Sequence, residues 1–423
     1  MTNEWKYLIY LYKCSVFGEE AIAPTDEIDW KKLLKLASNQ AISATVSLSL
    51  KNADFVPENI RQECSARTLS SAINNMQRTQ FLFDTLDYLS DNGFTPIILK
   101  GLDIARFYKV PDCRTSADND LFFPFDDEHE VLSALSQIGY EVEERKEGMN
   151  HGEASHPKGG TIETHAKLYS DTTASSIFGA YKDEMKLPDK FKTIPFLGSG
   201  REISVLLPDD AIFFLAVHLV KHFIYCGISI RQAFDFALYF SKCKDEIDKE
   251  KFWAACEKFG FRDFLFILLS MFIYEGCFSE SDFDGLVMQD KDLCDKMSDN
   301  IEKFSTKVMP TFDTWNYYYF RHLDNADKNI RKQRKKEHRK IVLGALFPSA
   351  DELEKKYGFL KNRHFLYPVA FVMRGFSALF NKEKKQSLSK TVSVPNNKKA
   401  KKNETASFDN ERIVLLSDFK LMK

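Results

Sequence analysis

The sequence has no pair of cysteines at the spacing of a metal or redox motif. Its eight cysteines are scattered from Cys14 to Cys294, and no two of them form a C-x-x-C motif. This absence argues against a zinc ribbon, a thioredoxin-like redox motif and a disulfide framework. We therefore expect reduced thiols, most of them in the core.

The sequence also lacks a strong charge of either sign and a long apolar run. Because the formal net charge is −2, binding of an anionic partner must depend on local patches. The first residues, MTNEWKYLIYLYK, contain neither a basic leader with a cleavage site nor an apolar run that could span a bilayer. These absences predict a cytoplasmic protein without a transmembrane segment.

The length and composition are those of a globular protein with more than one domain. Its 423 residues are 44% hydrophobic and 28% charged, which is enough to bury two cores. We expect an N-terminal helical brace over residues 1–92, a small mixed-sheet α/β unit over 93–200, a helical domain over 201–381 and a lysine-rich, disordered tail over 382–423. The predicted fold class is α+β, and removal of the tail should leave folding intact.

Helical patterns flank the short strands. Residues 27–52 place apolar side chains on one helical face, and a longer helical pattern over residues 60–90 ends at Asn92-Gly93. A helix is predicted over 126–138, followed by strands over 140–144 and 161–169. Beyond about residue 203 the pattern is helical, with a start signal at Leu207-Pro208 and aromatic-rich faces in the helices that follow.

The segment Pro96–Phe123 contains the residues best suited to chemistry. Its apolar run ends at Lys100-Gly101, and a glycine between a strand and a helix lets backbone amides approach a phosphate. Asp118 and Asp120 then open a strand, in which alternate residues point to the same face. Two carboxylates on one face can share divalent metal ions.

A second polar face is predicted further along the chain. Glu163, His165 and Lys167 alternate along the strand over residues 161–169, so they share a face that could point into a cleft. His165 has two alternative roles, which are substrate contact and orientation of Glu163. Simpler alternatives are a solvated strand end for Asp118 and Asp120, an exposed cation at Lys100 and a loop ion pair at Arg114.

In their order along the chain, these motifs resemble the uncharacterised nucleotidyltransferases of the DNA polymerase beta-like superfamily. The resemblance covers most of residues 27–380 and is sharpest over 96–167, where its motifs are Leu99-Lys100-Gly101, Arg114 to Asp120, Gly139-Tyr140 and Glu163-Thr164-His165. It implies that Asp118, Asp120 and Glu163 are catalytic and bind two Mg²⁺ or Mn²⁺ ions. It further implies that Gly101 contacts the triphosphate, and we assign Lys100, Arg114 and His165 to nucleotide binding.

The resemblance implies transfer of a nucleoside monophosphate from a nucleoside triphosphate to an acceptor, with release of pyrophosphate. It leaves a sugar, a lipid precursor and a protein side chain open as the acceptor. Two positions depart from the superfamily pattern: Leu102 replaces the usual serine after the glycine, and Asn119 replaces the usual apolar residue between the aspartates. Both departures favour the alternative, a non-catalytic nucleotide-binding or interaction module with the same fold.

Other charged and polar residues have simpler explanations. His218 and His222 have the spacing of a zinc helix, but Leu219 stands where a metalloprotease needs glutamate, so we expect structural histidines. Asp235 should pair with Arg231 one helical turn earlier, and the alternative is that it reaches the cleft from the second domain. The basic run Lys328–Lys340 should be a solvated helix face, with a weak contact to an anionic partner, either phosphate-rich or lipid, as the alternative.

Overall fold

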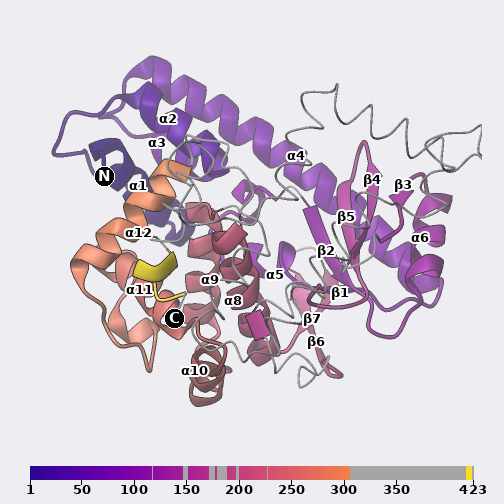
Figure 1. Ribbon diagram of the computed structural model, residues 1–423. Helices are drawn as coiled ribbons and strands as arrows, with labels where there is room; N and C mark the ends of the chain where they lie inside the picture. The colour runs from indigo at the N-terminus through magenta and orange to yellow at the C-terminus, as the bar shows by residue number, and fades with distance from the viewer. Residues whose placement is uncertain are drawn as a thin grey trace, which may run out of the picture. The chain divides into compact units, whose positions relative to one another are not determined.

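The computed structural model describes residues 1–116, 118–145, 151–170, 177–178, 188–196, 200–225, 227–304 and 416–421. The described residues combine helices with a seven-stranded mixed sheet (Figure 1). This architecture confirms the predicted α+β class. The part of the predicted helical domain after residue 304, including the basic run Lys328–Lys340, and the lysine-rich part of the predicted tail lie outside the described residues.

Four helices precede the sheet: α1 Asn3–Phe17, α2 Trp30–Asn39, α3 Ser43–Leu50 and α4 Glu58–Asp91. The pattern over residues 27–52 forms two helices because the chain turns at Ala41, whose φ of 57° is left-handed. The long pattern before Asn92 is confirmed as α4. Helix α1 was not predicted from the sequence. Its apolar residues are buried in the core, and Trp5 Nε1 donates a hydrogen bond to Ser298 Oγ at 2.9 Å.

The strands of the sheet are arranged in the order β3-β4-β5-β2-β1-β7-β6. Their bounds are β1 Ile97–Ile98, β2 Asp118–Phe122, β3 Glu141–Glu143, β4 His151–His156, β5 Gly160–His165, β6 Phe191–Phe196 and β7 Arg201–Leu206. β2 pairs antiparallel with β1 and parallel with β5, which places it near the centre of the sheet. The helical pattern expected from residue 203 begins later, because β7 continues to Leu206 and pairs parallel with β1.

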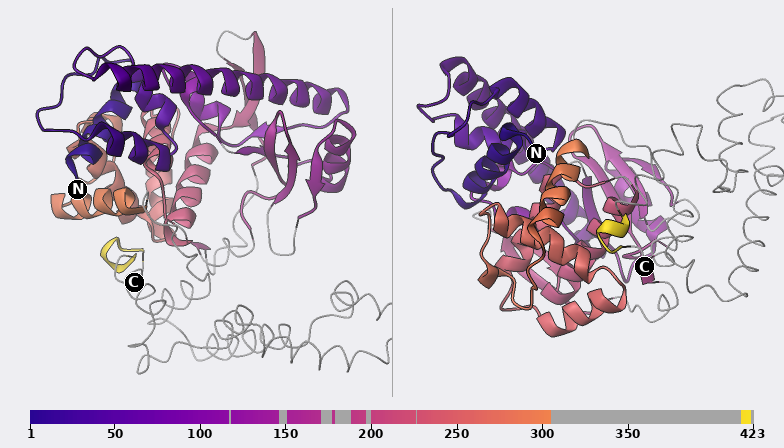
Figure 2. Two further views of the ribbon diagram at one scale, coloured as in Figure 1. Left: turned by 90° about the horizontal axis from the view of Figure 1, so that it is seen from above. Right: turned by 60° about the vertical axis from the view of Figure 1, so that its left-hand side comes forward.

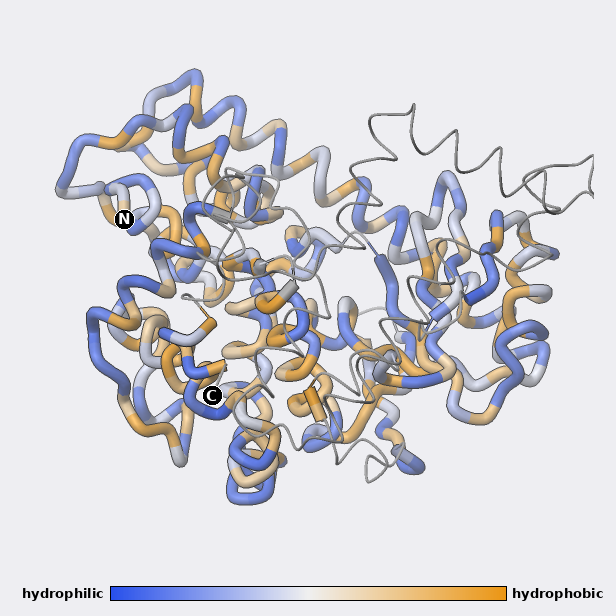
Figure 3. Tube along the Cα trace, viewed as in Figure 1, coloured by the Kyte–Doolittle hydropathy of each residue, from blue (hydrophilic) through white to orange (hydrophobic). Residues whose placement is uncertain are grey.

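Helices α4 and α6 (Glu128–Gln137) pack on one face of the sheet. Leu82 of α4 and Leu135 of α6 share one apolar core with Leu121 and Ile162 of the strands. Figures 1 and 2 show α4 running from the N-terminal helices to this sheet. Along β2 the residues change from hydrophilic at 118–120 to hydrophobic at Leu121. Figure 3 shows that the chain as a whole alternates between hydrophilic and hydrophobic stretches. Since strand residues alternate, the polar neighbours of Leu121 and Ile162 point to the opposite face.

Helices follow the sheet, as the aromatic-rich patterns predicted. They are α8 Pro208–Tyr225, α9 Ile230–Lys242, α10 Lys249–Lys258, α11 Arg262–Tyr274 and α12 Lys291–Phe304. Phe234 of α9 and Phe272 of α11 pack edge to face at 5.4 Å between ring centroids. The seven described cysteines are all buried and free. Within the described part of the chain, none of the helices has the length and apolar character needed to cross a membrane.

The end of the described chain differs from the predicted disordered tail. Leu416, Phe419 and Leu421 are buried, and the Phe419 ring lies 5.5 Å from the ring of Phe223 in α8. Leu416 ends the segment Ile413–Leu416, for which the sequence offers docking on the core as an alternative to disorder; residues 413–415 lie outside the described chain. The correction has a simple cause: three apolar side chains close together provide enough surface to bury, which the lysine-rich residues before them lack.

Candidate functional site

Two neighbouring strands bring three carboxylates together. β2 and β5 run parallel with Asp120 beside Glu163, so both side chains lie on the sheet face opposite the α4 core. Asp118 is two residues earlier on β2, and oxygens of all three carboxylates lie within 4.8 Å of one another. Carboxylate oxygens are the ligands that Mg²⁺ and Mn²⁺ prefer. The structure therefore assembles the three residues that the sequence motifs selected.

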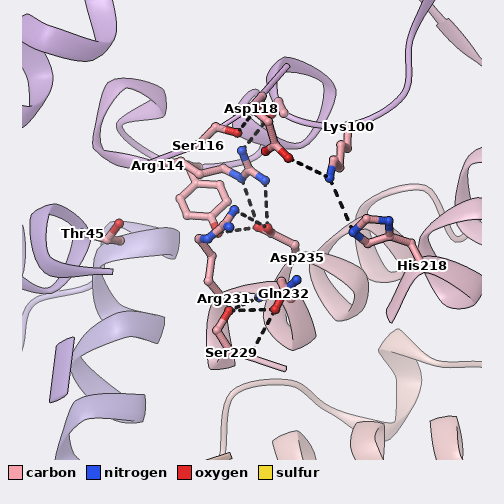
Figure 4. Close-up of polar contacts among 12 residues, drawn as sticks. Thr45, Lys100, Arg114, Ser116, Asp118, His218, Ser229, Arg231, Gln232 and Asp235 are labelled. Atoms are coloured by element: carbon pink, nitrogen blue, oxygen red, sulfur yellow. Dashed lines mark hydrogen bonds and ion pairs between the residues drawn. The ribbon is translucent and has the colours of Figure 1, made fainter. Parts of the chain in front are cut away.

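Lys100 faces these carboxylates. Its Nζ lies 3.0 Å from Asp120 Oδ2 and 3.7 Å from Asp118 Oδ2, so the ammonium stands where a bound cation would place its charge (Figure 4). Burial would lower the pKa of Lys100, but the charges of Asp120 and Asp118 outweigh burial and raise it. The lysine is thus a charged partner of the site and not an exposed strand-end cation.

Asp120 is the most deeply buried of the three carboxylates. Burial alone would raise its pKa, but Lys100 and His165 hold the pKa well below its ordinary value. Its Oδ2 atom is buried and has Lys100 Nζ as its ion-pair partner at 3.0 Å. A buried carboxylate oxygen that already faces a cation is suited to a divalent ion in place of the ammonium.

Two histidines stand beside Glu163. His165 Nε2 lies 3.2 Å from Asp120 Oδ1 and 3.3 Å from Glu163 Oε2; burial would lower the pKa of His165, but these carboxylates raise it. His151 opens β4 opposite His165 in the register, with Nδ1 3.8 Å from Glu163 Oε2. Burial lowers the pKa of His151. His151 was not predicted as a site residue, because its strand, HGEASH, does not show the alternation of apolar and polar residues that marks a strand in the sequence.

The turn at Gly101 is tied to a buried ion pair. Gly101 has a φ of 76°, in the region that favours glycine, and its carbonyl oxygen accepts a bond of 3.2 Å from Arg114 Nη1. Arg114 Nη2 in turn lies 2.8 Å from Asp235 Oδ2 on α9 (Figure 4). The predicted pair of Asp235 with Arg231 is also present, with Arg231 Nη1 3.6 Å from Asp235 Oδ2. The ion-pair alternative for Arg114 is therefore present, and its nucleotide contact stays a prediction.

Small clefts flank the carboxylates on two sides. In one of them Lys100 and Asp118 face the helices α8 and α9, which contribute His218, Arg231 and Gln232. The other cleft is lined by Asp120, His151, Glu163, His165, Tyr169, Ser170 and Lys221. Lys167, expected on the same strand face, lies beyond the end of β5 and is exposed. The carboxylates thus face a small cleft on each of two sides.

The histidines of α8 share a face, as predicted. The ring centroids of His218 and His222 lie 4.4 Å apart, and His218 Nε2 is 3.5 Å from Lys100 Nζ. Burial, and then the nearby lysines, lower the pKa of both histidines, to about 4 for His222. Among the described residues, neither histidine joins a cluster of three metal-ligating side chains.

The comparisons with known proteins agree with this geometry. A family model described as an uncharacterised nucleotidyltransferase matches residues 26–272, from just before α2 to within α11. The match ends well before residue 380, the limit expected from the motifs. Neither the comparison with curated proteins nor that with solved structures finds a match. The matched region is more than half of the chain and includes the three clustered carboxylates, and the chain therefore belongs to this family of uncharacterised nucleotidyltransferases.

Proposed function

We propose that the protein transfers a nucleoside monophosphate from a nucleoside triphosphate to an acceptor oxygen, using two Mg²⁺ or Mn²⁺ ions. The observation that supports this proposal is the cluster of Asp118, Asp120 and Glu163, in which oxygens of all three carboxylates lie within 4.8 Å of one another. The acceptor oxygen forms a bond to the α-phosphorus, the bond from that phosphorus to the bridging oxygen breaks, and pyrophosphate leaves. Bound divalent ions supply charge to the triphosphate and lower the pKa of the acceptor.

The remaining roles, which are metal binding, phosphate contact and proton transfer, are assigned to side chains of the protein. Asp118 and Asp120 would hold the ions, and Lys100, beside them, exchanges its carboxylate contacts for phosphate oxygens. Glu163 would complete the metal ligands and take the proton from the acceptor. His165 orients Glu163, because its Nε2 lies 3.3 Å from Glu163 Oε2. The acceptor is a sugar, a lipid precursor or a protein side chain, and the reaction is assigned to the cytoplasm.

A catalytically inactive nucleotide-binding module is the second candidate function. The specific observation in its favour is the position of Lys100, whose ammonium already offsets the charge of Asp118 and Asp120. Asn119 and Leu102 also line a narrow cleft on the opposite side of β2, at the two positions that depart from the superfamily pattern. Such a module would bind nucleotide without turnover.

Calorimetry and pyrophosphate release measured on one preparation separate these functions. We expect Mg²⁺ or Mn²⁺ to promote triphosphate binding, and Asp118→Asn and Asp120→Asn to abolish this dependence on metal. The exposed Asp245→Asn is the matched control. Metal-dependent binding without pyrophosphate release, with candidate acceptors supplied by a cell extract, would favour the inactive module. Unchanged metal-dependent affinity in both folded variants would overturn the metal assignment.

A further inference from the structure

One side of the carboxylate cluster is rich in nitrogen. His151, Glu163 and His165 come from the adjacent strands β4 and β5, and one ligand atom of each lies within 4.8 Å of the others. Glu163 Oε2 is 3.8 Å from His151 Nδ1 and 3.3 Å from His165 Nε2. Ligands held about 2.1 Å from one tetrahedral ion are about 3.4 Å from each other. The three side chains are therefore spaced as ligands of a single ion.

Asp120 adds a fourth atom to this group. Its Oδ1 lies 3.2 Å from His165 Nε2, while its Oδ2 is directed toward Lys100 on the other side of the carboxylate. The two oxygens of Asp120 thus face different surroundings: Oδ1 lies beside His165, and Oδ2 lies beside Lys100, which also contacts Asp118. A carboxylate placed in this way can bridge two ions that differ in their ligands.

Imidazole nitrogen selects among metal ions. Mg²⁺ prefers carboxylates, carbonyls and water, whereas the first-row transition ions accept imidazole and follow the Irving–Williams order of affinity. Binding through His165 Nε2 requires the ring proton at Nδ1, and binding through His151 requires the neutral ring.

We infer that His151, Glu163 and His165, with Asp120 Oδ1, form a metal position that binds a divalent transition ion such as Mn²⁺ or Zn²⁺ in preference to Mg²⁺. The inference rests on the proposed function, because it specifies one of the two ion positions. It assigns His151, which no superfamily motif above includes, as a ligand. The cleft lined by Tyr169, Ser170 and Lys221 gives an ion access to this position.

Cobalt provides the test, because Co²⁺ bound by two nitrogens and two oxygens absorbs visible light. We expect the full-length protein, stripped of metal, to bind one Co²⁺ with a visible band that a large excess of Mg²⁺ does not remove. His151→Phe keeps an aromatic ring but removes both nitrogens, and it should weaken Co²⁺ binding by about tenfold or more and change the band. The exposed His129→Gln is the matched control and should leave both unchanged.

Pulsed electron paramagnetic resonance on the wild-type protein with one Mn²⁺ requires no variant. It should detect coupling to ¹⁴N from coordinated imidazole. Absence of nitrogen coupling, displacement of Co²⁺ by an equal concentration of Mg²⁺, or an unchanged band in folded His151→Phe would each overturn the inference. These measurements use no nucleotide, so pyrophosphate release with Mg²⁺ as the only metal tests the proposed function separately.

Discussion

Arg114 and Asp235 are 121 residues apart in the sequence and form a buried ion pair with 2.8 Å between Nη2 and Oδ2. Tyr108 donates its hydroxyl to the other carboxylate oxygen at 2.6 Å, and Arg114 also holds the carbonyl of Gly101. The pair therefore joins the loop before β2 to helix α9. Through Arg114 the ion pair holds the Lys100-Gly101 turn in place beside the carboxylates.

Asp235→Asn should strongly destabilise the protein. The substitution leaves the Arg114 guanidinium buried without a countercharge, at a cost of about 3–5 kcal/mol in the free energy of unfolding. Denaturant unfolding measures this loss, and Asp87→Asn, which removes one carboxylate from an exposed ion pair with Arg201, should change stability by less than about 1 kcal/mol. Equal stability of the two variants would contradict a structural role for the buried pair.

Glu163→Gln should affect turnover more than binding. The amide keeps the size of the side chain and removes the charge, so nucleotide affinity should stay within about threefold while transfer falls by roughly 10²-fold or more. The change in stability should be at most about 1 kcal/mol. Melting temperature, nucleotide affinity and pyrophosphate release on one preparation check this result. Full turnover would remove Glu163 from the site.

The stability of the protein should fall in mild acid because of His222. Burial, with Lys221 and Lys100 nearby, lowers the pKa of His222 to about 4, below the value of about 6.5 in an unfolded chain. The unfolded chain therefore binds more protons between these values, so the stabilising contribution is complete above about pH 6.5 and is lost as the pH falls toward 4. The loss is on the order of 3 kcal/mol at most.

His222→Phe keeps a ring at this position and cannot bind a proton. Unfolding free energies measured from pH 7 to 4.5 should depend less on pH in this variant than in the wild type, whereas the exposed His129→Gln should follow the wild type. Parallel curves for wild type and His222→Phe would show that other groups cause the acid sensitivity.

Phe419→Ala should destabilise the helical region. Phe419 is fully buried and packs on Phe223, so loss of its ring should cost roughly 1–3 kcal/mol, less than a central core position because the short segment can detach alone. Lys420→Ala, which breaks only a half-exposed ion pair with Asp263, is the control. Removal of residues 382–423 should then lower the melting temperature, contrary to the expectation for a disordered tail. An unchanged melting temperature after this truncation would exclude the docking.

The sequence predicted those parts of the fold and site that depend on local periodicity. Asp118 and Asp120 share a face because a strand alternates, and α4 and α8 follow from apolar spacing and their start and stop signals. Glu163 needed the superfamily resemblance as well, because its place beside Asp120 depends on the parallel pairing of β2 with β5. Strand pairing between distant segments leaves no local pattern.

The features that were not predicted also depend on contacts between segments that are distant in the sequence. His151 belongs to the site only through the pairing of β4 with β5, and Asp235 meets Arg114 through the packing of α9. The predicted local pair of Asp235 with Arg231 is present at 3.6 Å, and the shorter bidentate contact with Arg114 is added to it. Only the tertiary contact could not be predicted from the local spacing.

The parallel pairing of β1 with β7 bears on synthesis at the ribosome. The strands that carry the carboxylates are complete once the ribosome has added residue 165. Strand β1, however, lacks its second neighbour until residues 201–206 emerge, and Arg114 lacks Asp235 until α9 follows. During this interval the nascent chain has an open strand edge beside the carboxylate cluster, and such edges attract other strands. Release of a chain that ends near residue 200 would therefore yield an aggregation-prone fragment that has all three carboxylates but an incomplete sheet.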